Sequence, residues 1–245
     1  MRKFGLIGYP LGHSFSKKYF SEKFASELLN DVAYENFELP EVALLKNIIA
    51  ENPGLRGLNI TIPYKESVLR YLDELNNDAS EIGAVNTVKI SSGKLKGFNT
   101  DYIGFMRSLI PVLQPSHKKA LVLGTGGSSL AVKYALEKLG IGFLLVSRNP
   151  FEENEIGYDA INEALLNTHT LLINTTPVGM FPNVSEAPEI PYHLLDQRHL
   201  LFDLIYNPEE TLFLKMGKER GAVVKNGLEM LALQAEESWK IWNDF

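Results

Sequence analysis

The chain contains no cysteine, which excludes disulfide bridges, thiolate metal ligands and a cysteine nucleophile. Basic residues are few: 24 Lys and Arg stand against 30 Asp and Glu, giving a net charge of -6, so nucleic acid is not an expected partner. The five histidines show no metal-ligand spacing, and no metal is expected. No apolar run approaches the ~18 residues of a membrane-spanning helix. The N-terminus leads into a strand pattern without a signal sequence, so the expected location is the cytoplasm.

What is present is typical of a globular chain. The 245 residues are 45% hydrophobic and 22% charged, enough for one large or two small domains. The stretch 110–116 contains two prolines and is the expected break between a first domain and a second. Strand and helix patterns alternate after residue 118, which predicts a parallel, doubly wound α/β sheet.

A glycine cluster lies between a strand pattern and a helix pattern. The apolar run Ala120–Leu123 meets Gly124, Gly126 and Gly127, and a helical pattern follows at once. This order is typical of a turn that binds the pyrophosphate of a dinucleotide, because glycines let backbone N–H groups approach the phosphates. Ser129 stands where a third glycine is usual. The alternative is an ordinary strand-to-helix turn.

The end of the next strand indicates which dinucleotide is bound. Gly142–Val146 is apolar throughout, as a strand buried on both faces should be, and Arg148 follows, 24 residues after Gly124. An NAD enzyme usually carries an acidic residue near ~20 residues on, yet residues 147–149 include none. A guanidinium pairs well with a 2′-phosphate, so the sequence predicts NADP over NAD. The alternative is a solvated charge at the strand end.

The first half of the chain has two polar stretches after strand patterns. Ser14 and Ser16 follow the strand at residues 4–8 and could face one ligand, although Ser16 fits a helix N-cap equally well. In Leu55–Lys65, apolar Leu58, Ile60 and Ile62 alternate with polar residues, and Pro63 is expected to begin a helix. Lys65 would then lie in the first helical turn as a candidate acid–base group; the alternative is a solvated surface lysine.

Further elements are expected along the chain. Asn99–Asp101 is predicted to cap a helix over 102–109, and Asp101 could be only that cap. In the second half, helices are expected over 154–166 and 210–219 and from 226, with strands at 171–174, 200–205 and 222–225.

Taken together, several motifs resemble the shikimate dehydrogenase family. They run in the family's order along nearly the whole chain and are as follows: Gly8–Ser16, Asn59–Lys65, Gly83–Thr87, Gly97–Asp101, Asn174–Met180, Asp203–Pro208, and Gly227–Leu231 with Gln234.

This resemblance implies a substrate-binding catalytic domain (1–100), an NADP-binding Rossmann domain (101–225) and a C-terminal helix packing back on the first domain (226–245). It implies that NADPH reduces 3-dehydroshikimate to shikimate, in the chorismate branch of aromatic amino-acid biosynthesis. The only expected partners are this small-molecule substrate and, in a homodimer, a second copy; a monomer is equally compatible.

The resemblance also assigns roles by position. Lys65 and Asp101 match the catalytic pair. Ser14 and Ser16 match the residues that hold the substrate carboxylate, and the other substrate contacts match Thr61, Asn86, Tyr206 and Gln234. The pyrophosphate turn matches Gly124, Thr125, Gly126, Gly127 and Ser128. The adenosine-phosphate clasp matches Ser147, Arg148 and Asn149, and the nicotinamide side matches Thr175, Ile205, Gly227 and Met230.

The chain departs from the family pattern in four places. Lys17 replaces a usual proline, Ser147–Asn149 stands for Asn-Arg-Thr, Thr125 and Ser128 replace alanines, and the segment 150–170 is short. Two other functions therefore stay open: a quinate/shikimate dehydrogenase that uses NAD, and a non-catalytic NADP-binding regulatory protein. The second is disfavoured by the presence of both Lys65 and Asp101.

Overall fold

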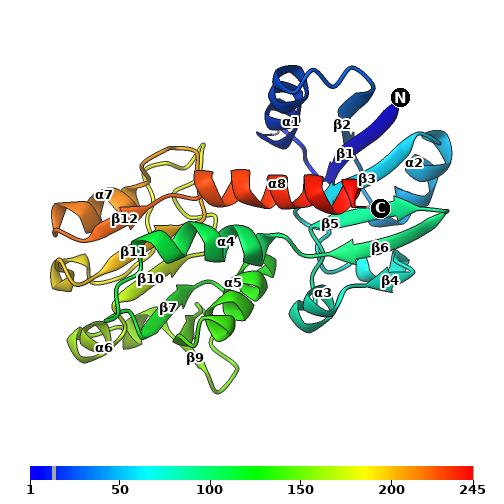
Figure 1. Cartoon of the computed structure of the whole chain (residues 1–245). Helices are drawn as coiled ribbons and strands as arrows, with labels where there is room; N and C mark the ends of the chain where they lie inside the picture. Colours follow the sequence, from blue (N-terminus) through cyan, green and yellow to red (C-terminus); the bar gives the residue numbers. More distant parts are fainter. Residues whose placement is uncertain (13–14, 245) are drawn as a thin grey trace. The chain divides into compact units, whose positions relative to one another are not determined.

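The computed structural model describes residues 1–12 and 15–244, and the chain divides into two compact units (Figure 1). Unit 1 comprises Met1–Thr100 and Gln234–Phe245, and unit 2 comprises Asp101–Leu233. The sequence-based division placed a boundary before residue 226, whereas the observed one falls inside the last helix, α8 (Leu228–Asn243). The reason is that Met230 packs in the core of unit 2, while Ala235 and Trp242 pack in that of unit 1.

Unit 1 is built on a mixed six-stranded sheet with the order β2-β1-β3-β5-β6-β4. Its strands are β1 (Arg2–Gly8), β2 (Val32–Glu38), β3 (Leu55–Ile60), β4 (Glu74–Leu75), β5 (Thr87–Ser91) and β6 (Lys94–Phe98). β1 pairs with β2 and β3 in parallel, β3, β5 and β6 pair antiparallel, and β4 runs parallel to β6. β5 and β6 form a hairpin that turns between Ser91 and Lys94.

Helices cover the two faces of the unit 1 sheet. They are α1 (Phe15–Ser26), α2 (Leu45–Glu51) and α3 (Asn77–Ile82), with short 3-10 turns at Val42–Leu44 and Leu69–Tyr71. Phe4 packs with α1 and α8 on one face, and Ile7 and Leu58 belong to the core of the other. Trp242 of α8 stacks on Phe4 with ring centroids 4.8 Å apart. Its indole nitrogen lies 2.2 Å from where a Cβ on Gly57 would be, so only glycine lets α8 approach β3 this closely.

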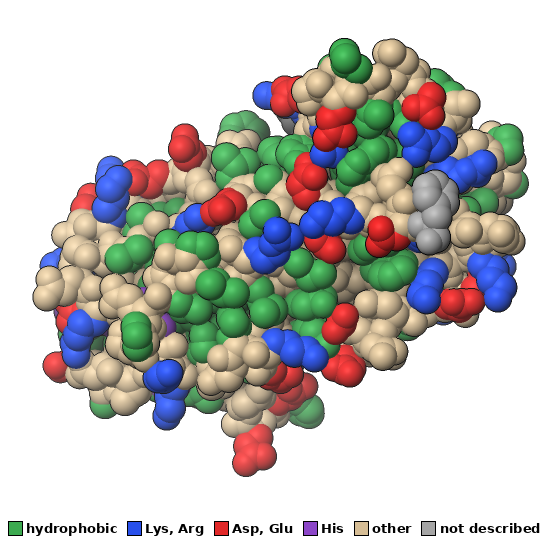
Figure 2. Space-filling model, in the orientation of Figure 1, with side chains coloured by type: hydrophobic (Ala, Val, Ile, Leu, Met, Phe, Trp, Pro, Cys, Tyr) green, Lys and Arg blue, Asp and Glu red, His purple; other side chains and the backbone are tan. Residues whose placement is uncertain are grey.

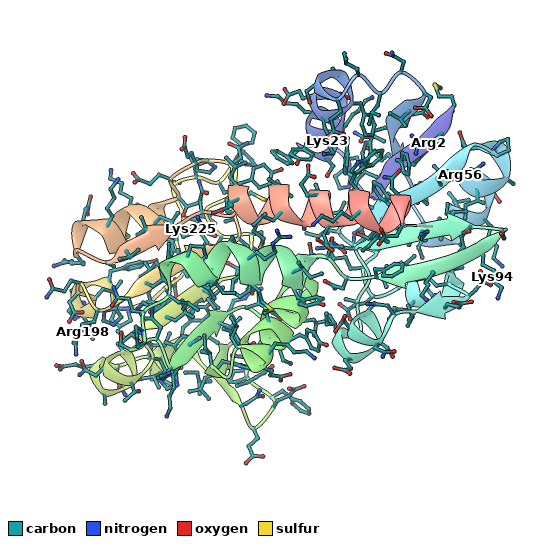
Figure 3. The ribbon with its side chains drawn as sticks, in the orientation of Figure 1. Arg2, Lys23, Arg56, Lys94, Arg198 and Lys225 are labelled. Atoms are coloured by element: carbon teal, nitrogen blue, oxygen red, sulfur yellow. The ribbon has the colours of Figure 1, made fainter. Side chains whose placement is uncertain are left out.

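An ion pair adds to the packing of α8 within unit 1. The ammonium group of Lys23 on α1, labelled in Figure 3, lies 3.0 Å from a carboxylate oxygen of Glu236 on α8. The Tyr19 hydroxyl donates a hydrogen bond to the same carboxylate. Lys23 also pairs with Glu27 of the chain segment that follows α1.

Unit 2 is built on a six-stranded sheet in which every pairing is parallel. The strands are β7 (Lys119–Leu123), β8 (Gly142–Val146), β9 (Glu155–Ile156), β10 (Leu171–Asn174), β11 (Leu200–Asp203) and β12 (Val223–Lys225). Their order is β12-β11-β10-β7-β8-β9. The strand order therefore reverses between β7 and β10, as in the Rossmann fold, and the predicted doubly wound sheet is confirmed.

Both faces of this sheet are covered. The helices of the unit are α4 (Asp101–Leu109), α5 (Gly127–Lys138), α6 (Glu163–Thr168) and α7 (Leu212–Glu219), with short 3-10 turns at Ile110–Val112, Tyr158–Ala160 and Tyr192–Leu194. Because successive strand residues point to opposite faces, Ala120 and Val122 pack with Phe105 of α4, whereas Leu121 and Leu123 pack with Phe213 of α7. The side chains of alternate residues in β7 thus pack in two separate hydrophobic cores, one on each face of the sheet.

One predicted helix is wrong. Residues 154–162 do not form the expected helix, because Glu155 and Ile156 instead add an edge strand, β9, in parallel to β8. A 3-10 turn follows at Tyr158–Ala160, and α6 begins only after Asn162, whose side chain accepts a hydrogen bond from the Leu165 amide. The apolar side chains of this segment are therefore buried by a strand and a turn rather than by one face of a helix.

The surroundings of Lys65 also differ from expectation. Residues 62–68 form turns, and helical structure appears only at Leu69–Tyr71. The Lys65 carbonyl accepts a hydrogen bond from the Val85 amide at 2.8 Å, so it is not free to serve a helix. Lys65 therefore does not lie in the first turn of a helix, and this prediction is wrong. Ile62, expected to continue the buried side of β3, is 65% exposed.

Within the described part of the chain, no helix is both long and apolar enough to cross a membrane. Figure 2 shows basic and acidic side chains interspersed over the face it draws.

Candidate active site and dinucleotide cavity

A cavity of about 890 Å³ opens in unit 2 beyond the carboxyl ends of β7, β8 and β10. This is the point where the strand order reverses, and open α/β sheets bind ligands there. Its lining includes seven residues predicted to bind the cofactor: Gly124, Thr125, Gly126, Ser147, Arg148, Asn149 and Thr175. The fold thus brings residues up to 51 positions apart in the sequence into one cavity. For example, the Thr175 hydroxyl donates a hydrogen bond to the Gly124 carbonyl.

The glycine turn is shaped for an anion. Gly124 has φ +102°, and a Cβ there would lie 2.7 Å from the Thr176 methyl group, so the turn requires glycine. Gly126 is the N-cap residue of α5 and, having no side chain, makes no side-chain cap hydrogen bond. A Cβ on Gly126 would meet nothing within 4 Å, so the space beside this helix start is open. The hydroxyl of Ser129 donates back to the Gly126 carbonyl, which gives the serine a local structural role.

Arg148 lines the same cavity from the turn that directly follows β8. It is exposed, and among the described residues it forms no ion pair or hydrogen bond. Its five N–H donors are therefore available to a ligand. The Asn149 amide donates to the Ser147 hydroxyl at 3.2 Å, which shapes the short turn that carries Arg148.

The remaining predicted cofactor residues fall into two groups. Gly127 and Ser128 begin α5, immediately after the cavity-lining Gly126. Ile205, Gly227 and Met230 lie at the end of β11 and the start of α8; the Gly227 amide donates to the Ile205 carbonyl at 3.0 Å, and Met230 is buried in the core. These three do not line the cavity, and their contact with a cofactor stays a prediction.

In unit 1, Thr61 and Lys65 follow the end of β3. The Thr61 amide donates to the Ile7 carbonyl at 2.8 Å, which holds the turn against the end of β1. Gly8 allows this approach, since a Cβ there would lie 2.5 Å from the Thr61 methyl group. Tyr64 anchors the middle of the turn by donating to the Leu39 carbonyl. Lys65 is half-buried on this rigid turn.

Asn86 and Gln234 belong to a buried amide–hydroxyl network in unit 1. Asn86 donates to the Gln234 side-chain oxygen at 3.2 Å and to the Thr100 hydroxyl at 2.9 Å. The network continues through hydroxyl and amide groups on the sheet and on α8: Tyr34, Asn59, Thr87, Thr100 and Ser238. Because a buried polar group costs free energy unless it is paired, this network fixes the orientation of both predicted substrate-binding amides.

The other predicted substrate residues are placed as follows. Ser14 lies outside the described residues. Ser16 is buried inside α1, which begins at Phe15, so the N-cap alternative for Ser16 is wrong; it hydrogen-bonds Tyr34. Tyr206 follows β11, and burial raises its pKa.

Asp101, the acidic member of the predicted catalytic pair, is the buried first residue of α4. Lys65 and Asp101 belong to different units, and their action as a pair stays a prediction.

A buried carboxylate supports the end of β11, close in sequence to Tyr206. Asp203 is fully buried and accepts hydrogen bonds from Thr211 at 2.6 Å, Asn174 at 3.0 Å and the Ile205 amide at 3.0 Å. Burial raises the pKa of Asp203 to about 6, although these hydrogen bonds act in the opposite direction. The folded chain therefore binds this proton more tightly than the unfolded chain.

This linkage gives a testable pH dependence. The stabilisation from protonated Asp203 is complete below about pH 4 and is lost as the pH rises through about 6. Relative to Asp203→Asn, which does not titrate, the wild type should lose up to ~3 kcal/mol between those limits. Thermal unfolding of both proteins at several pH values measures this loss, and a wild-type-minus-variant difference that stays constant with pH would contradict it.

Sequence reasoning missed several residues at these sites. Tyr158, Glu186 and Glu189 line the cavity; Tyr158 lies in the segment that was predicted as a helix, and the other two lie in a segment for which no element was predicted. Thr176 lies within a motif from which only Thr175 was predicted to contact the cofactor. Asn59, for which the sequence predicted no role of its own, is buried in the amide–hydroxyl network. The described residues contain no cluster of three or more His, Asp or Glu side chains suited to a metal.

The fold of unit 2, with a glycine turn at the reversal of strand order and an unpaired arginine after the second strand, defines the dinucleotide-binding Rossmann class. The model of the shikimate dehydrogenase substrate binding domain matches residues 6–88. The chain is 37% identical to the NADP(+) shikimate dehydrogenase of Caldicellulosiruptor bescii over 100% of this chain and 90% of that protein. It is 40% identical to the Methanococcus aeolicus enzyme, over 97% and 90%. The chain belongs to the shikimate dehydrogenase family.

A solved structure agrees along the whole chain. Shikimate 5-dehydrogenase from Thermus thermophilus, in complex with NADP(H) and shikimate, superposes with a TM-score of 0.88 at 34% identity. The match covers 99% of this chain and 94% of that one. Both units are therefore shared with that enzyme, not the Rossmann unit alone.

Proposed function

We propose that the chain catalyses the reduction of 3-dehydroshikimate to shikimate with NADPH. The observation that carries this proposal is the similarity to NADP(+) shikimate dehydrogenases, which extends over both units of the chain. The cavity supports it independently, because a glycine turn and an unpaired arginine fit a pyrophosphate and a 2′-phosphate.

NADPH would supply a hydride from its nicotinamide ring when bound. The chain's own residues must then stabilise the negative charge that develops on the ketone oxygen. Lys65 is the proposed proton donor to that oxygen, held on a turn that is fixed at Thr61 and Tyr64. Asp101 is proposed to orient Lys65 and to accept a hydrogen bond from a substrate hydroxyl.

Recognition of the substrate is assigned to unit 1. Ser14 and Ser16 are proposed to bind the carboxylate, and the ring hydroxyls are proposed to bond Thr61, Asn86 and Gln234. Asn86 and Gln234 are joined by a direct hydrogen bond. This bond supports the proposal that both bind the substrate, because it holds the two side-chain amides in one fixed arrangement. Tyr206 completes the proposed set from unit 2.

Arg148→Ala tests the cofactor assignment. Because a guanidinium can pair with the 2′-phosphate that NADPH has and NADH lacks, the variant should raise the KM for NADPH by roughly tenfold or more, with little change for NADH. Lys138→Ala, which removes a cation from the end of α5, is the matched control. Equal increases for both nucleotides would contradict the assignment of Arg148.

Steady-state assays test the function itself. We expect the purified protein to oxidise shikimate with NADP⁺ at a higher kcat/KM than quinate with either nucleotide. Preference for quinate with NAD⁺ would favour the quinate/shikimate alternative. Tight NADP⁺ binding with no turnover of shikimate would favour a non-catalytic protein.

A further inference from the structure

Tyr158 lines the dinucleotide cavity from a segment that the sequence did not assign to any site. The residue opens the 3-10 turn Tyr158–Ala160, which directly follows the edge strand β9. β9 is held beside the arginine-bearing end of β8 by the pairing of Val146 with Ile156 and by a hydrogen bond from the Ser147 amide to the Ile156 carbonyl at 2.9 Å. The position of Tyr158 near the end of β8 is therefore set by backbone pairing, not by a free loop.

The hydroxyl of Tyr158 lies in an electrostatic setting made by two charged residues of the same cavity. Partial burial raises its pKa, the positive charge of Arg148 lowers it, and the negative charge of Glu189 raises it. All three side chains line the cavity. Tyr158 and Arg148 thus converge on one region of the cavity from two different segments of the chain.

This hydroxyl has no hydrogen-bond partner among the described residues, although the side chain is half-buried. Other tyrosine hydroxyls of the chain are paired: Tyr64 donates to Leu39, Tyr34 to Asn59 and Tyr192 to Pro188. A partly desolvated hydroxyl without a partner is an unused donor. Arg148 beside it has no ion pair with the described residues, so a cation and a hydroxyl donor are available together.

A 2′-phosphate has three terminal oxygens, and a guanidinium engages two of them in its bidentate geometry. A further donor is needed for the third oxygen. We propose that the Tyr158 hydroxyl donates a hydrogen bond to the 2′-phosphate of NADPH, next to Arg148, and so acts as a specificity-determining residue for NADPH over NADH. This inference rests on the proposed function only in the identity of the nucleotide.

The acidic residue Glu189 affects how strongly this cavity can bind a phosphate. Its carboxylate and that of Glu186 line the same cavity and disfavour an anion, and among the described lining residues Arg148 is the one cation that offsets them. A neutral donor such as Tyr158 adds affinity for the phosphate without a further charge. The hydroxyl therefore matters more here than it would in a purely basic pocket.

The test is direct binding of two fragments, adenosine 2′,5′-bisphosphate and AMP, measured by titration calorimetry on the full chain. Tyr158→Phe removes only the hydroxyl. We expect it to weaken binding of the bisphosphate about tenfold, as for loss of one hydrogen bond to a charged group, and to leave AMP binding unchanged. Tyr71→Phe, a half-exposed tyrosine of unit 1 outside the proposed site, should change neither.

The outcomes separate this inference from the proposed function. If Tyr158→Phe binds the bisphosphate as tightly as the wild type, or weakens both fragments equally, the inference is overturned. In that case shikimate oxidation by the wild type can still establish the function. If the wild type itself binds the bisphosphate no better than AMP, the NADP assignment and the inference both fail. Thermal unfolding of Tyr158→Phe confirms that a loss of binding is not a loss of fold.

Discussion

Replacing Lys65 by alanine is expected to lower kcat by a factor of roughly 10²–10⁴, the usual contribution of a general acid–base group. The KM for shikimate should change less than kcat, because the main interaction is with charge that develops in the transition state. The fold should survive, since the half-buried side chain starts from a turn held by backbone hydrogen bonds at Thr61 and Val85. Steady-state kinetics with shikimate and NADP⁺ measure the effect.

Two further variants make the Lys65 result specific. Lys65→Met keeps the length of the side chain but not its proton, so it should lose as much kcat as the alanine variant. Lys46→Ala removes an exposed lysine on α2 of the same unit and should leave kcat unchanged. A Lys65→Ala protein with near-normal kcat would remove Lys65 from the chemistry.

The largest effect on stability is expected for Gly227→Ala. A Cβ at Gly227 would lie 2.1 Å from the Leu204 carbonyl oxygen and 2.6 Å from its carbon. These are backbone atoms and cannot rotate away, so the start of α8 would have to move off the end of β11. Such overpacking costs about 1–3 kcal/mol or more, which corresponds to a fall in Tm of roughly 3–12 °C for a chain of this size.

Gly142→Ala is the matched control for this prediction. Gly142 lies in the same unit, and an added Cβ would meet only ordinary contacts at 3.8 Å and 3.9 Å. Its Tm should stay close to that of the wild type. Since the displaced helix start also carries Met230, the Gly227 variant should show a higher KM for NADPH if these residues contact the nicotinamide side. Unfolding of Gly227→Ala at the wild-type temperature would show that the close approach of α8 to β11 is not needed.

The Rossmann unit was predictable because its signals are local. β7 and β10 are continuous apolar runs, and the glycine cluster between β7 and α5 marks a turn that few other residues allow. β10 was predicted with its observed bounds at Leu171–Asn174. The phosphate side of the cavity was predictable too, because Gly124 directly follows β7 and Arg148 lies in the turn after β8, which is also an apolar run.

The segment between Arg148 and α6 was not predictable in the same way. Two residues, Glu155 and Ile156, form strand β9 only because the edge of β8 is available to pair with them. That pairing is a contact between separate strands, and two residues are too few to show the alternation of a strand, so the segment was predicted as part of a helix instead. Tyr158, which depends on β9 for its position, was missed for the same reason.

The substrate side shows a different limit. Asn59 is one of the polar residues that alternate with apolar ones in β3, yet it is 4% exposed. Its partners, Tyr34, Thr87 and Ser238, come from β2, β5 and α8. A buried polar residue is tolerated only where it has hydrogen-bond partners. The partners of Asn59 lie up to 179 positions away in the sequence, so the local pattern cannot predict its burial.

Hydride transfer to the substrate ketone is the central claim, and isotope transfer tests it most directly. The purified protein is incubated with 3-dehydroshikimate and NADPH carrying deuterium at both C4 positions of the nicotinamide ring, and the product is analysed by mass spectrometry and NMR. The predicted result is shikimate with one deuterium on the carbon that bears the new hydroxyl. Shikimate without deuterium, or NADPH that stays bound and unoxidised, would contradict the account.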